Sequence, residues 1–429
     1  MAPDVNPDAT EGQPPSLPTI DEFRAEARAW LSQRVPLRRQ RATNWGEGSD
    51  RVPVFHNVSV EEERKVIDDL RAWKRQRFDA GYGPLSWPPE YGGRSLPPVY
   101  ELAFSEEEAA FDVPPVHEAV GITTELIAPT IREWGTAEQR NRFLMPMLRT
   151  DELWCQLYSE PGAGSDLAAI RTRADFDGEQ WTINGQKVWT SGAQHASWGY
   201  LIARSDPSLP KHRGLTAFLL PMDAPGVEVR PLRQMSGGSS FNEVFFTDVR
   251  LADTARLGER NGGWSVAMTT LGFERVAGSG EGGDLIGRFQ AALGLSRHFG
   301  RDRDPVVRQQ LAAVYMYGRL AELNSERARQ AWSAGATPGP EGSISKLFHA
   351  NGLASVTRLV SLLLGPRLAA DTGEWGTFAW AEHVTGAPGN RIAGGTDEVQ
   401  RTIIGERILG LAPEPKVDRD VPFQQAAAR

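Results

Sequence analysis

The chain has 429 residues, a formal net charge of -8 at pH 7 and a pI near 5.6. This length exceeds what one minimal core needs, so we expect two or three domains or one elongated, layered fold. The acidic balance, with arginines scattered among acids, argues against a nucleic-acid partner. The single cysteine, Cys155, cannot form an internal disulfide, and no Cys/His spacing indicates a metal site.

Residues 1–18 are polar and rich in proline, which predicts a disordered leader rather than a signal peptide. No run approaches the roughly 20 apolar residues that a membrane span needs. We therefore expect a cytoplasmic protein without a membrane partner.

Residues 19–152 predict an N-terminal α-helical domain. Apolar residues recur there at helical spacing, as in the stripe of Phe23, Ala27 and Trp30. Thr136 is followed three residues later by a glutamine, a capping-box pattern that predicts the start of a helix. The stretch 81–93 is rich in glycine and proline, which predicts an ordered surface loop between helices.

Residues 153–255 change to a period of two, which predicts a central β-domain. Asn184-Gly185, between QWTI and QKVW, predicts a two-residue hairpin turn, and Asp177-Gly178 predicts another. Further short apolar runs are separated by turn residues and predict a small antiparallel sandwich or barrel; they cover residues 200–203, 215–220, 227–230 and 243–246.

Helical spacing returns over residues 256–412 and predicts long amphipathic helices packed as an antiparallel C-terminal bundle. Residues 413–429 are polar and contain proline, which predicts a flexible tail. Helices, strands and helices in separate blocks predict an α+β fold with segregated layers. No GxGxxG opens a helix after a strand, so the pattern does not favour a Rossmann domain.

The glycine-rich stretch YSEPGAGSD, at 158–166, lies where the helical part gives way to the strands. Gly162 and Gly164 permit positive φ and close backbone approach. Together with the hydroxyls of Ser159 and Ser165, the turn could bind a phosphate or the edge of a flat polar ring. A simple turn at a strand entry would have the same sequence.

A second motif, KVWTSG at 187–192, strengthens the case for a ligand. It places Trp189 beside the hydroxyls of Thr190 and Ser191 at the end of a predicted strand. An aromatic face beside hydroxyl donors suits an isoalloxazine ring, although a core tryptophan would look the same.

Six motifs, in order, make the chain similar to the acyl-CoA dehydrogenase superfamily of flavoproteins from about residue 20 to residue 412. They are LSWPPEYGG at 85–93, WGTAEQRNRFLMPMLRTDE at 134–152, YSEPGAGSD at 158–166, NGQKVWTSG at 184–192, LGFERV at 271–276 and IAGGTDEVQRTIIGERILGL at 392–411. The family fold, a helical domain, a β-domain and a C-terminal four-helix bundle, agrees with the three periods above. The resemblance implies FAD and an acyl thioester, carried by coenzyme A or by an acyl carrier protein.

The resemblance also implies the residues of the site. Those implied for FAD are Gln156, Tyr158, Ser159, Gly164, Ser165, Trp189, Thr190, Ser191, Thr396 and Glu398. Ser191 would hydrogen-bond near the reactive flavin nitrogen, and Thr396 would meet the cofactor at a helix start. Those implied for the substrate are Ser165, Arg275, Gly394 and Gly395.

The family reaction needs one carboxylate base, because it removes a proton from the carbon α to a thioester and a hydride from the β carbon. A free carboxylate of pKa about 4.3 is a weak base for that carbon, so the site must raise this pKa and stabilise the enolate-like oxygen. Many members carry the glutamate directly before the Gly-Thr of the last motif, where this chain has Gly394. A minority carry it on a C-domain helix before an arginine, which here is Glu274-Arg275.

We therefore predict Glu274 as the base, with the backbone N–H of Gly394 holding the thioester oxygen. The apolar neighbours of Glu274 in the sequence favour this role, whereas a glutamate on a helix is more often a solvated surface charge. The missing side chain at position 394 would leave room for a bulkier acyl group.

Family homotetramers complete the FAD site with an arginine and a Gln-x-x-Gly-Gly segment from a neighbouring subunit. Here Ser296 stands at the arginine position, and residues 362–371 read LLLGPRLAAD in place of that segment. The resemblance thus leaves two assemblies open: a homo-oligomer, usually a tetramer, or a heteromer in which unlike chains each contribute half a site.

We expect FAD-dependent α,β-dehydrogenation of an acyl-CoA thioester in fatty acid metabolism, with electrons leaving through an electron-transfer flavoprotein. Two alternatives stay open on the same fold. One is an acyl-CoA oxidase or flavin monooxygenase, and the other is a non-catalytic partner subunit of a heteromeric dehydrogenase.

Overall fold

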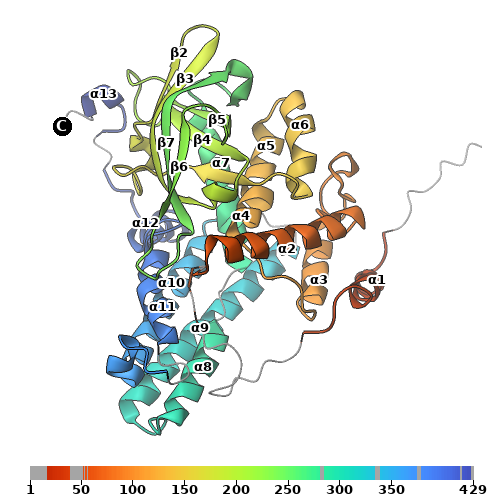
Figure 1. The fold of residues 1–429 in the computed structure, drawn as a ribbon, viewed down its shortest axis with the longest axis vertical. Helices are drawn as coiled ribbons and strands as arrows, with labels where there is room; N and C mark the ends of the chain where they lie inside the picture. Colours follow the sequence, from red (N-terminus) through yellow and green to blue (C-terminus); the bar gives the residue numbers. More distant parts are fainter. Residues whose placement is uncertain are drawn as a thin grey trace, which may run out of the picture.

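The computed structural model describes residues 17–38, 52, 54–55, 57–280, 285–333, 339–373, 378–415 and 418–426, except the side chains of residues 275–280 and 332–333. Most of the predicted leader therefore lies outside the described residues. Figure 1 shows a β-sheet at the top, N-terminal helices beside and below it, and most of the C-terminal helices at the bottom.

The N-terminal part is helical, as predicted. Its helices are α1 (Ile20–Ser32), α2 (Val60–Asp79), α3 (Pro98–Glu108), α4 (Glu118–Gly121), α5 (Ala128–Trp134) and α6 (Ala137–Leu148), with a π-helical turn η2 (Ile122–Ile127). Thr136 caps α6 through the predicted capping box, and Thr19 and Ser59 cap α1 and α2 in the same way. Residues 81–93 carry only a single 3-10 turn, so the predicted loop is confirmed.

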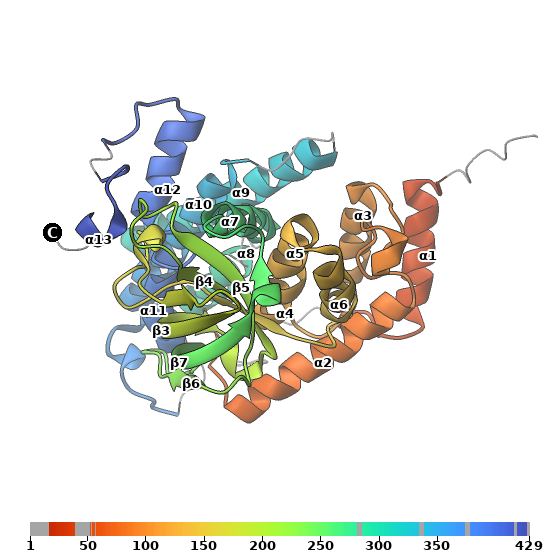
Figure 2. The same cartoon turned by 90° about the horizontal axis from the view of Figure 1, so that it is seen from above.

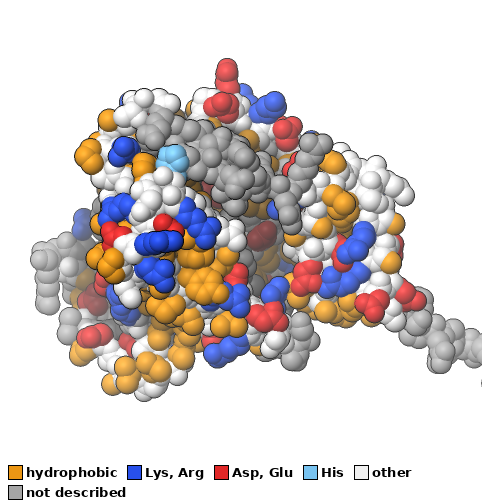
Figure 3. All heavy atoms as spheres, turned by 90° about the horizontal axis from the view of Figure 1, so that it is seen from below, with side chains coloured by type: hydrophobic (Ala, Val, Ile, Leu, Met, Phe, Trp, Pro, Cys, Tyr) orange, Lys and Arg blue, Asp and Glu red, His pale blue; other side chains and the backbone are white. Residues whose placement is uncertain are grey.

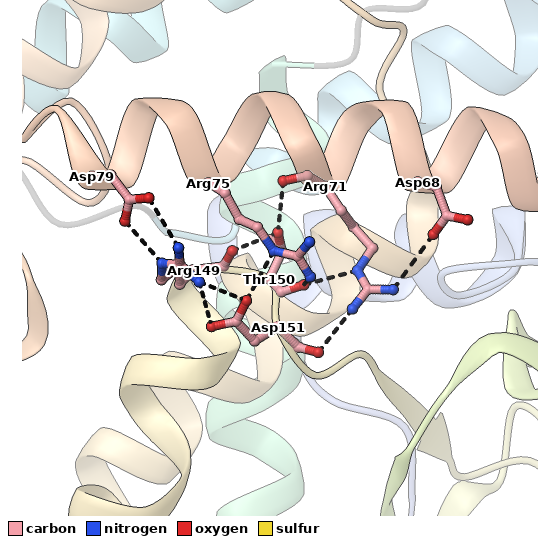
Figure 4. A network of polar contacts seen from close by, with 7 residues as sticks. All are labelled: Asp68, Arg71, Arg75, Asp79, Arg149, Thr150 and Asp151. Carbon is pink, nitrogen blue, oxygen red and sulfur yellow. Dashed lines mark hydrogen bonds and ion pairs between the residues drawn. The ribbon is translucent and has the colours of Figure 1, made fainter.

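A network of charged groups fixes the start of the sheet to α2 (Figure 4). The Arg71 guanidinium donates to the backbone carbonyls of Thr150 and Asp151, both at 2.8 Å. Arg149 binds the carboxylate of Asp79 at 2.8 Å and that of Asp151 at 2.9 Å. Because residues 149–151 lead directly into the first strand, this network sets where the strand enters.

The central part is one eight-stranded sheet, with strand order β6-β7-β3-β2-β4-β5-β8 and β1 beside β4. The strands are β1 (Trp154–Leu157), β2 (Arg173–Phe176), β3 (Gln180–Ser191), β4 (Trp198–Arg204), β5 (Leu215–Pro221), β6 (Val227–Leu232), β7 (Phe241–Ala252) and β8 (Arg256–Leu257). Most pairs are antiparallel, as expected. The pairs β1–β4 and β2–β4 are parallel, which the short alternating runs did not indicate.

The predicted hairpin at Asn184-Gly185 is wrong. Strand β3 continues through this dipeptide, and its register with β7 shifts between Ile183 and Gly185, which marks a β-bulge. Gly185 has φ 151°, and a Cβ there would lie 2.7 Å from the Cα of Thr172. The glycine therefore serves a bulge and a close strand approach rather than a turn. Asp177-Gly178 does join β2 to β3, as predicted.

The C-terminal part is a helical bundle, as predicted. Its helices are α7 (Gly263–Gly280), α8 (Leu285–His298), α9 (Pro305–Ser333), α10 (Gly342–Leu364), α11 (Ala379–Gly386) and α12 (Asp397–Ile403). Helix α10 packs against α7, α8 and α9, and α7 also contacts strand β5. Figure 2 shows α7 between the sheet and the long helices, so this helix joins the two layers.

Helix α10 is unusually long and apolar. Among the residues that the structure describes, the segment Gly342–Leu368 is the one helix long and apolar enough to cross a membrane. Half of its most apolar window is buried inside the protein, and it contacts five other bundle helices, α7, α8, α9, α11 and α12. A core helix has these properties.

Part of the predicted flexible tail contacts the β-domain. The short helix α13 (Phe423–Ala426) follows residues 418–422, and the Phe423 ring lies 3.9 Å from the Arg204 guanidinium carbon. Lys211 forms ion pairs with Asp418 of the tail, at 2.7 Å, and with Asp166 of the glycine-rich stretch, at 2.8 Å. The described end of the chain thus contacts Lys211, in the loop between β4 and β5, and through it the glycine-rich stretch.

Candidate active site

The two central motifs lie side by side, although about 20 residues separate them in the sequence. The Val188 N–H donates to the Ser159 carbonyl at 2.9 Å, next to the end of β1. The Lys187 ammonium donates to the Tyr158 carbonyl at 2.9 Å and to the Glu160 carboxylate at 2.8 Å. The glycine-rich stretch therefore runs along β3 where β3 carries the KVWTSG motif.

A buried ion pair holds this arrangement, and the sequence analysis missed it. Lys187 is fully buried, and burial lowers its pKa to about 8. Burial acts to raise the pKa of Glu160, but the charge of Lys187 and the hydrogen bonds that Glu160 accepts together bring this pKa below its usual value. Glu160 also accepts from the backbone N–H groups of Arg171 and Thr172, at 2.6 and 2.9 Å. The two buried charges thus have polar partners inside the domain, and their hydrogen bonds hold the backbone of the turn.

The turn at Gly162 and Gly164 does not use the positive φ that glycine allows, because neither residue has one. A Cβ at either position would meet nothing within 4 Å. Gly164 and Ser165 are exposed, so this side of the turn faces solvent. A cavity of about 250 Å³ lies beside Gly162, lined also by Glu160, Pro161, Ala169, Arg171, Thr172, Gly185 and Gln186. That lining contains neither Trp189 nor Glu274, so the cavity is not where the predicted chemistry lies.

The end of β3 presents an aromatic face and a hydroxyl. Trp189 is 62% exposed and has φ 63°, a strained value for a residue other than glycine. Its ring meets Phe241 edge-on, at a centroid distance of 6.1 Å. Thr190 is 2% exposed, and its hydroxyl has no hydrogen-bond partner among the described residues. Ser191 is half-buried. An open indole face beside a buried, unpaired hydroxyl fits a planar polar ligand.

A buried network fixes this strand end from behind. The amide nitrogen of Asn242 donates to the Thr190 carbonyl at 3.0 Å and to the side-chain carbonyl of Gln194. Gln194 in turn donates to the Glu63 carboxylate at 3.1 Å. Helix α2 thereby holds the residues that follow Trp189. No local pattern predicts this network, because its members come from distant segments.

Two histidines surround the same carboxylate. His195 lies 3.0 Å and His117 3.3 Å from the oxygens of Glu63. Burial alone would raise the pKa of Glu63, but hydrogen bonds from the two imidazoles bring that pKa down to about 2. Glu63 is therefore an anion at neutral pH. Within the part of the chain that the structure describes, no group of three or more His, Cys, Asp or Glu is arranged to hold a metal ion.

A second set of contacts leads from the motifs to helix α7. The ring of Tyr158 lies 5.5 Å from that of Tyr200, whose hydroxyl accepts a hydrogen bond from Thr270 at 3.2 Å. Thr270 also lies 2.9 Å from the hydroxyl of Thr130 in α5. Because residues four apart share one face of a helix, Glu274 lies on the same side of α7 as Thr270.

Glu274 meets the last motif at Gly394. A Cβ placed on Gly394 would lie 3.3 Å from Oε1 of Glu274. The two positions that the resemblance implies for a glutamate, 274 and 394, thus lie next to each other, although 120 residues separate them. Glu274 is half-buried. Arg275 belongs to α7, but its side chain lies outside the described residues.

The loop of the last motif is held by its own polar contacts. Gly394 and Gly395 have φ 61° and 89°, values that favour glycine. Thr396 caps α12 by accepting from the Val399 N–H, so its hydroxyl already has one partner. The Glu398 side chain is 78% exposed. Gln156, on β1, is half-buried. The FAD roles of these residues stay predictions.

All three domains of one protein family match the chain. The model of the acyl-CoA dehydrogenase N-terminal domain matches residues 18–151, that of the middle domain residues 155–249, and that of the C-terminal domain residues 261–409.

Full-length relatives and solved structures agree with these matches. The acyl-CoA dehydrogenase IpdE1 of Mycobacterium tuberculosis is 38% identical over 399 residues, covering 92% of this chain and 99% of the relative. The structure of the Tcur3481-Tcur3483 steroid ACAD superposes with a TM-score of 0.71 at 26% identity, over 93% of this chain and 99% of the other. The ChsE4-ChsE5 complex from Mycobacterium tuberculosis gives a TM-score of 0.67 at 27% identity, with the same coverage of both chains.

Proposed function

The chain belongs to the acyl-CoA dehydrogenase family of FAD-dependent oxidoreductases, and we propose that it forms the α,β double bond of an acyl-CoA thioester with Glu274 as the base. One observation carries the assignment of the base. Oε1 of Glu274 lies 3.3 Å from the point where a Cβ at position 394 would stand, and the resemblance implies that many family members carry their glutamate at that position.

The described residues fit FAD. The exposed indole of Trp189 and the buried, unpaired hydroxyl of Thr190 support a ring site at the end of β3. The remaining cofactor contacts are Gln156, Tyr158, Ser159, Gly164, Ser165, Ser191, Thr396 and Glu398. When bound, FAD accepts the hydride that leaves the β carbon of the substrate.

The chain's own groups handle the proton and the oxygen. The α C–H bond breaks, its proton goes to the Glu274 carboxylate, and the electron pair left behind forms the double bond as the β hydrogen departs. The Gly394 N–H donates to the thioester oxygen, which stabilises the charge that develops there. Substrate covering the site excludes water, which raises the pKa of Glu274 and makes it a stronger base. Ser165, Arg275 and Gly395 contact the substrate.

The acyl group is bulky, and it carries a ring system. One similar structure is described as a steroid ACAD, which supports a bulky, ring-bearing acyl group. Coenzyme A is the carrier, as the names of the relatives suggest. The reaction takes place in the cytoplasm, and an electron-transfer flavoprotein takes the electrons.

The active assembly contains an unlike partner chain. Ser296 is fully buried, and its hydroxyl donates to the Leu293 carbonyl at 2.8 Å, so it cannot reach a neighbouring subunit's cofactor. One of the similar structures is a complex of two named chains. Each subunit would then contribute different parts of the cofactor sites.

Anaerobic titration of the purified flavoprotein with a panel of straight-chain and ring-bearing acyl-CoA thioesters tests the function. We expect one ring-bearing thioester to bleach the flavin, with slow reoxidation in air. Rapid peroxide formation would indicate an oxidase instead. A different result would indicate a non-catalytic partner. In that case the purified chain is colourless, reacts with none of the thioesters, and gives a yellow complex only with a companion chain.

A further inference from the structure

One lysine side chain closes the loop that contains Gly394. We propose that Lys346 is a positioning residue for the reaction: it pins the glycine loop and places a positive charge beside Glu274. This inference rests on the proposed function, because it assigns a role relative to the proposed base.

The contacts of Lys346 bracket the glycine. Its ammonium donates to the Asn390 carbonyl at 2.7 Å and to the Gly395 carbonyl at 2.8 Å. The Gln400 amide donates to the Gly394 carbonyl at 2.8 Å. Lysine has three N–H donors, so the same ammonium bridges both ends of the loop. The carbonyls of Gly394 and of the residues four before and one after it are thereby held from α10 and α12.

The loop needs this support. Two consecutive glycines have little conformational preference of their own, and the neighbouring Ile392 is 67% exposed. A hydrogen-bond donor for the thioester oxygen acts well only if it is held in place before the reaction, because reorganisation would cost free energy. Lys346 supplies this order from a long helix of the bundle.

The charge of Lys346 lies close to Glu274. The point where a Cβ of Gly394 would stand is 3.3 Å from Oε1 of Glu274 and 4.0 Å from Cε of Lys346. Four other charged groups act on Lys346: Asp397, Glu274, Arg391 and Glu398. Asp397 already binds Arg391 at 2.7 Å, and Glu398 is largely exposed to water. Glu274 is thus the carboxylate of the reaction site that this cation serves.

The effect on pH dependence has a definite sign. The base must be ionised to accept a proton, so kcat/KM rises with pH through the pKa of Glu274. A nearby cation favours the ionised carboxylate and lowers that pKa. Removing the charge of Lys346 therefore moves the rising limb of kcat/KM toward higher pH. A purely structural role would lower the rate without moving the limb.

The test compares Lys346→Met and Lys346→Gln, which remove the charge, with Lys346→Arg, which keeps it. Each is studied as the FAD-loaded assembly, with Lys65→Met as a control on an exposed part of α2. We expect both neutral variants to shift the midpoint of kcat/KM upward by about one pH unit, the size expected for an opposite charge at this range. Lys346→Arg and Lys65→Met should stay at the wild-type midpoint.

A second measurement does not depend on turnover. A 3-oxoacyl thioester bound to each variant ionises to its enolate, whose ultraviolet absorption reports the charge balance at the site. In the neutral variants, half of the bound thioester should ionise only at a pH about one unit higher than in the wild type. This readout applies to any variant that retains FAD, and Lys346→Gln keeps hydrogen-bond donors if the methionine variant unfolds.

The outcomes separate the two hypotheses. If Glu274→Gln is inactive but the neutral Lys346 variants keep both midpoints, the role of Lys346 is refuted while the proposed function stands. The same holds if the arginine variant shifts as much as the neutral ones. If Glu274→Gln bleaches the flavin normally, the proposed base is wrong whatever Lys346 does.

Discussion

Position 394 matters through the side chain that it lacks. Oε1 of Glu274, the proposed base on α7, lies 3.3 Å from where a Cβ at position 394 would stand, so a larger residue in the loop would press against this carboxylate. The positive φ of Gly394 adds a second reason for glycine at this position. The proposed site therefore depends on both residues, Glu274 and Gly394, and not on the glutamate alone.

Gly394→Ala tests this dependence. The new methyl would lie 3.3 Å from Oε1 of Glu274, at a backbone φ of 61°. The left-handed conformation costs about 1–2 kcal/mol with a Cβ, so we expect kcat/KM to fall about tenfold while FAD stays bound. The measurement is anaerobic flavin bleaching. Gly121→Ala, where a Cβ meets nothing within 4 Å, is the control. An unchanged rate in Gly394→Ala would contradict the account.

At the scale of elements, the local signals predicted the helices well and the strand pairing poorly. Thr136 and the stripe of Phe23 and Ala27 predict correctly because a cap or a helix face involves residues a few positions apart. Asn184-Gly185 misleads because a bulge and a turn share this dipeptide, and the choice depends on β7, about 60 residues away.

The candidate site shows the same division. The two central motifs and Glu274 could be proposed from the sequence, because each lies within a short recognisable stretch, and their roles stay predictions. The contacts that hold them could not: Glu63, His117 and His195 come from three separate segments and meet only in the folded chain. The pairing of Lys187 with Glu160 likewise depends on strands that come together through the fold.

Gly185→Ala should destabilise the β-domain. A Cβ there would lie 2.6–2.8 Å from atoms of Thr172, and φ is 151°. Strained backbone of this kind costs about 1–3 kcal/mol, so the urea midpoint of unfolding should fall clearly below that of the wild type. Gly162→Ala, which meets open space at a φ that other residues adopt, should unfold like the wild type. Equal midpoints for all three proteins would argue against the bulge.

The network around Glu63 predicts a pH dependence of stability. The folded pKa of about 2 lies below the usual value near 4.3, so the unfolded chain binds the proton more readily. Glu63 therefore stabilises the fold fully above about pH 4.3, and this contribution is lost as pH falls toward 2. Glu63→Gln should lower Tm at pH 7 and lower it less at pH 3. A Tm difference that grows on acidification would contradict this sign.

At the scale of the whole molecule, the order of layers followed from the three periods of the sequence, whereas the assembly depends on surfaces. The face seen from below carries hydrophobic side chains near a group of lysines and arginines (Figure 3). On α9, Met316, Leu320 and Leu323 are 57, 43 and 57% exposed and lie at helical spacing. Such a stripe is typical of a helix face that is covered in an assembly.

Charged substitutions on that stripe should weaken the assembly. Met316→Glu combined with Leu320→Glu places two carboxylates on the exposed apolar face of α9, where desolvating them would oppose association. Light scattering should show the wild type above the 47.1 kDa of one chain and the double variant at or near it. Val60→Glu changes an exposed apolar residue on α2 and should keep the wild-type mass. A double variant of unchanged mass would place the interface elsewhere.

The central claim is that the carboxylate of Glu274 takes the α-proton of the thioester. The direct measurement is the anaerobic rate of flavin bleaching in Glu274→Gln, compared with Glu259→Gln, whose residue is exposed near the start of α7. We expect Glu274→Gln to retain FAD but bleach at least about a hundredfold more slowly, the scale of a lost general base, while Glu259→Gln matches the wild type. Bleaching at the wild-type rate in Glu274→Gln would contradict the account.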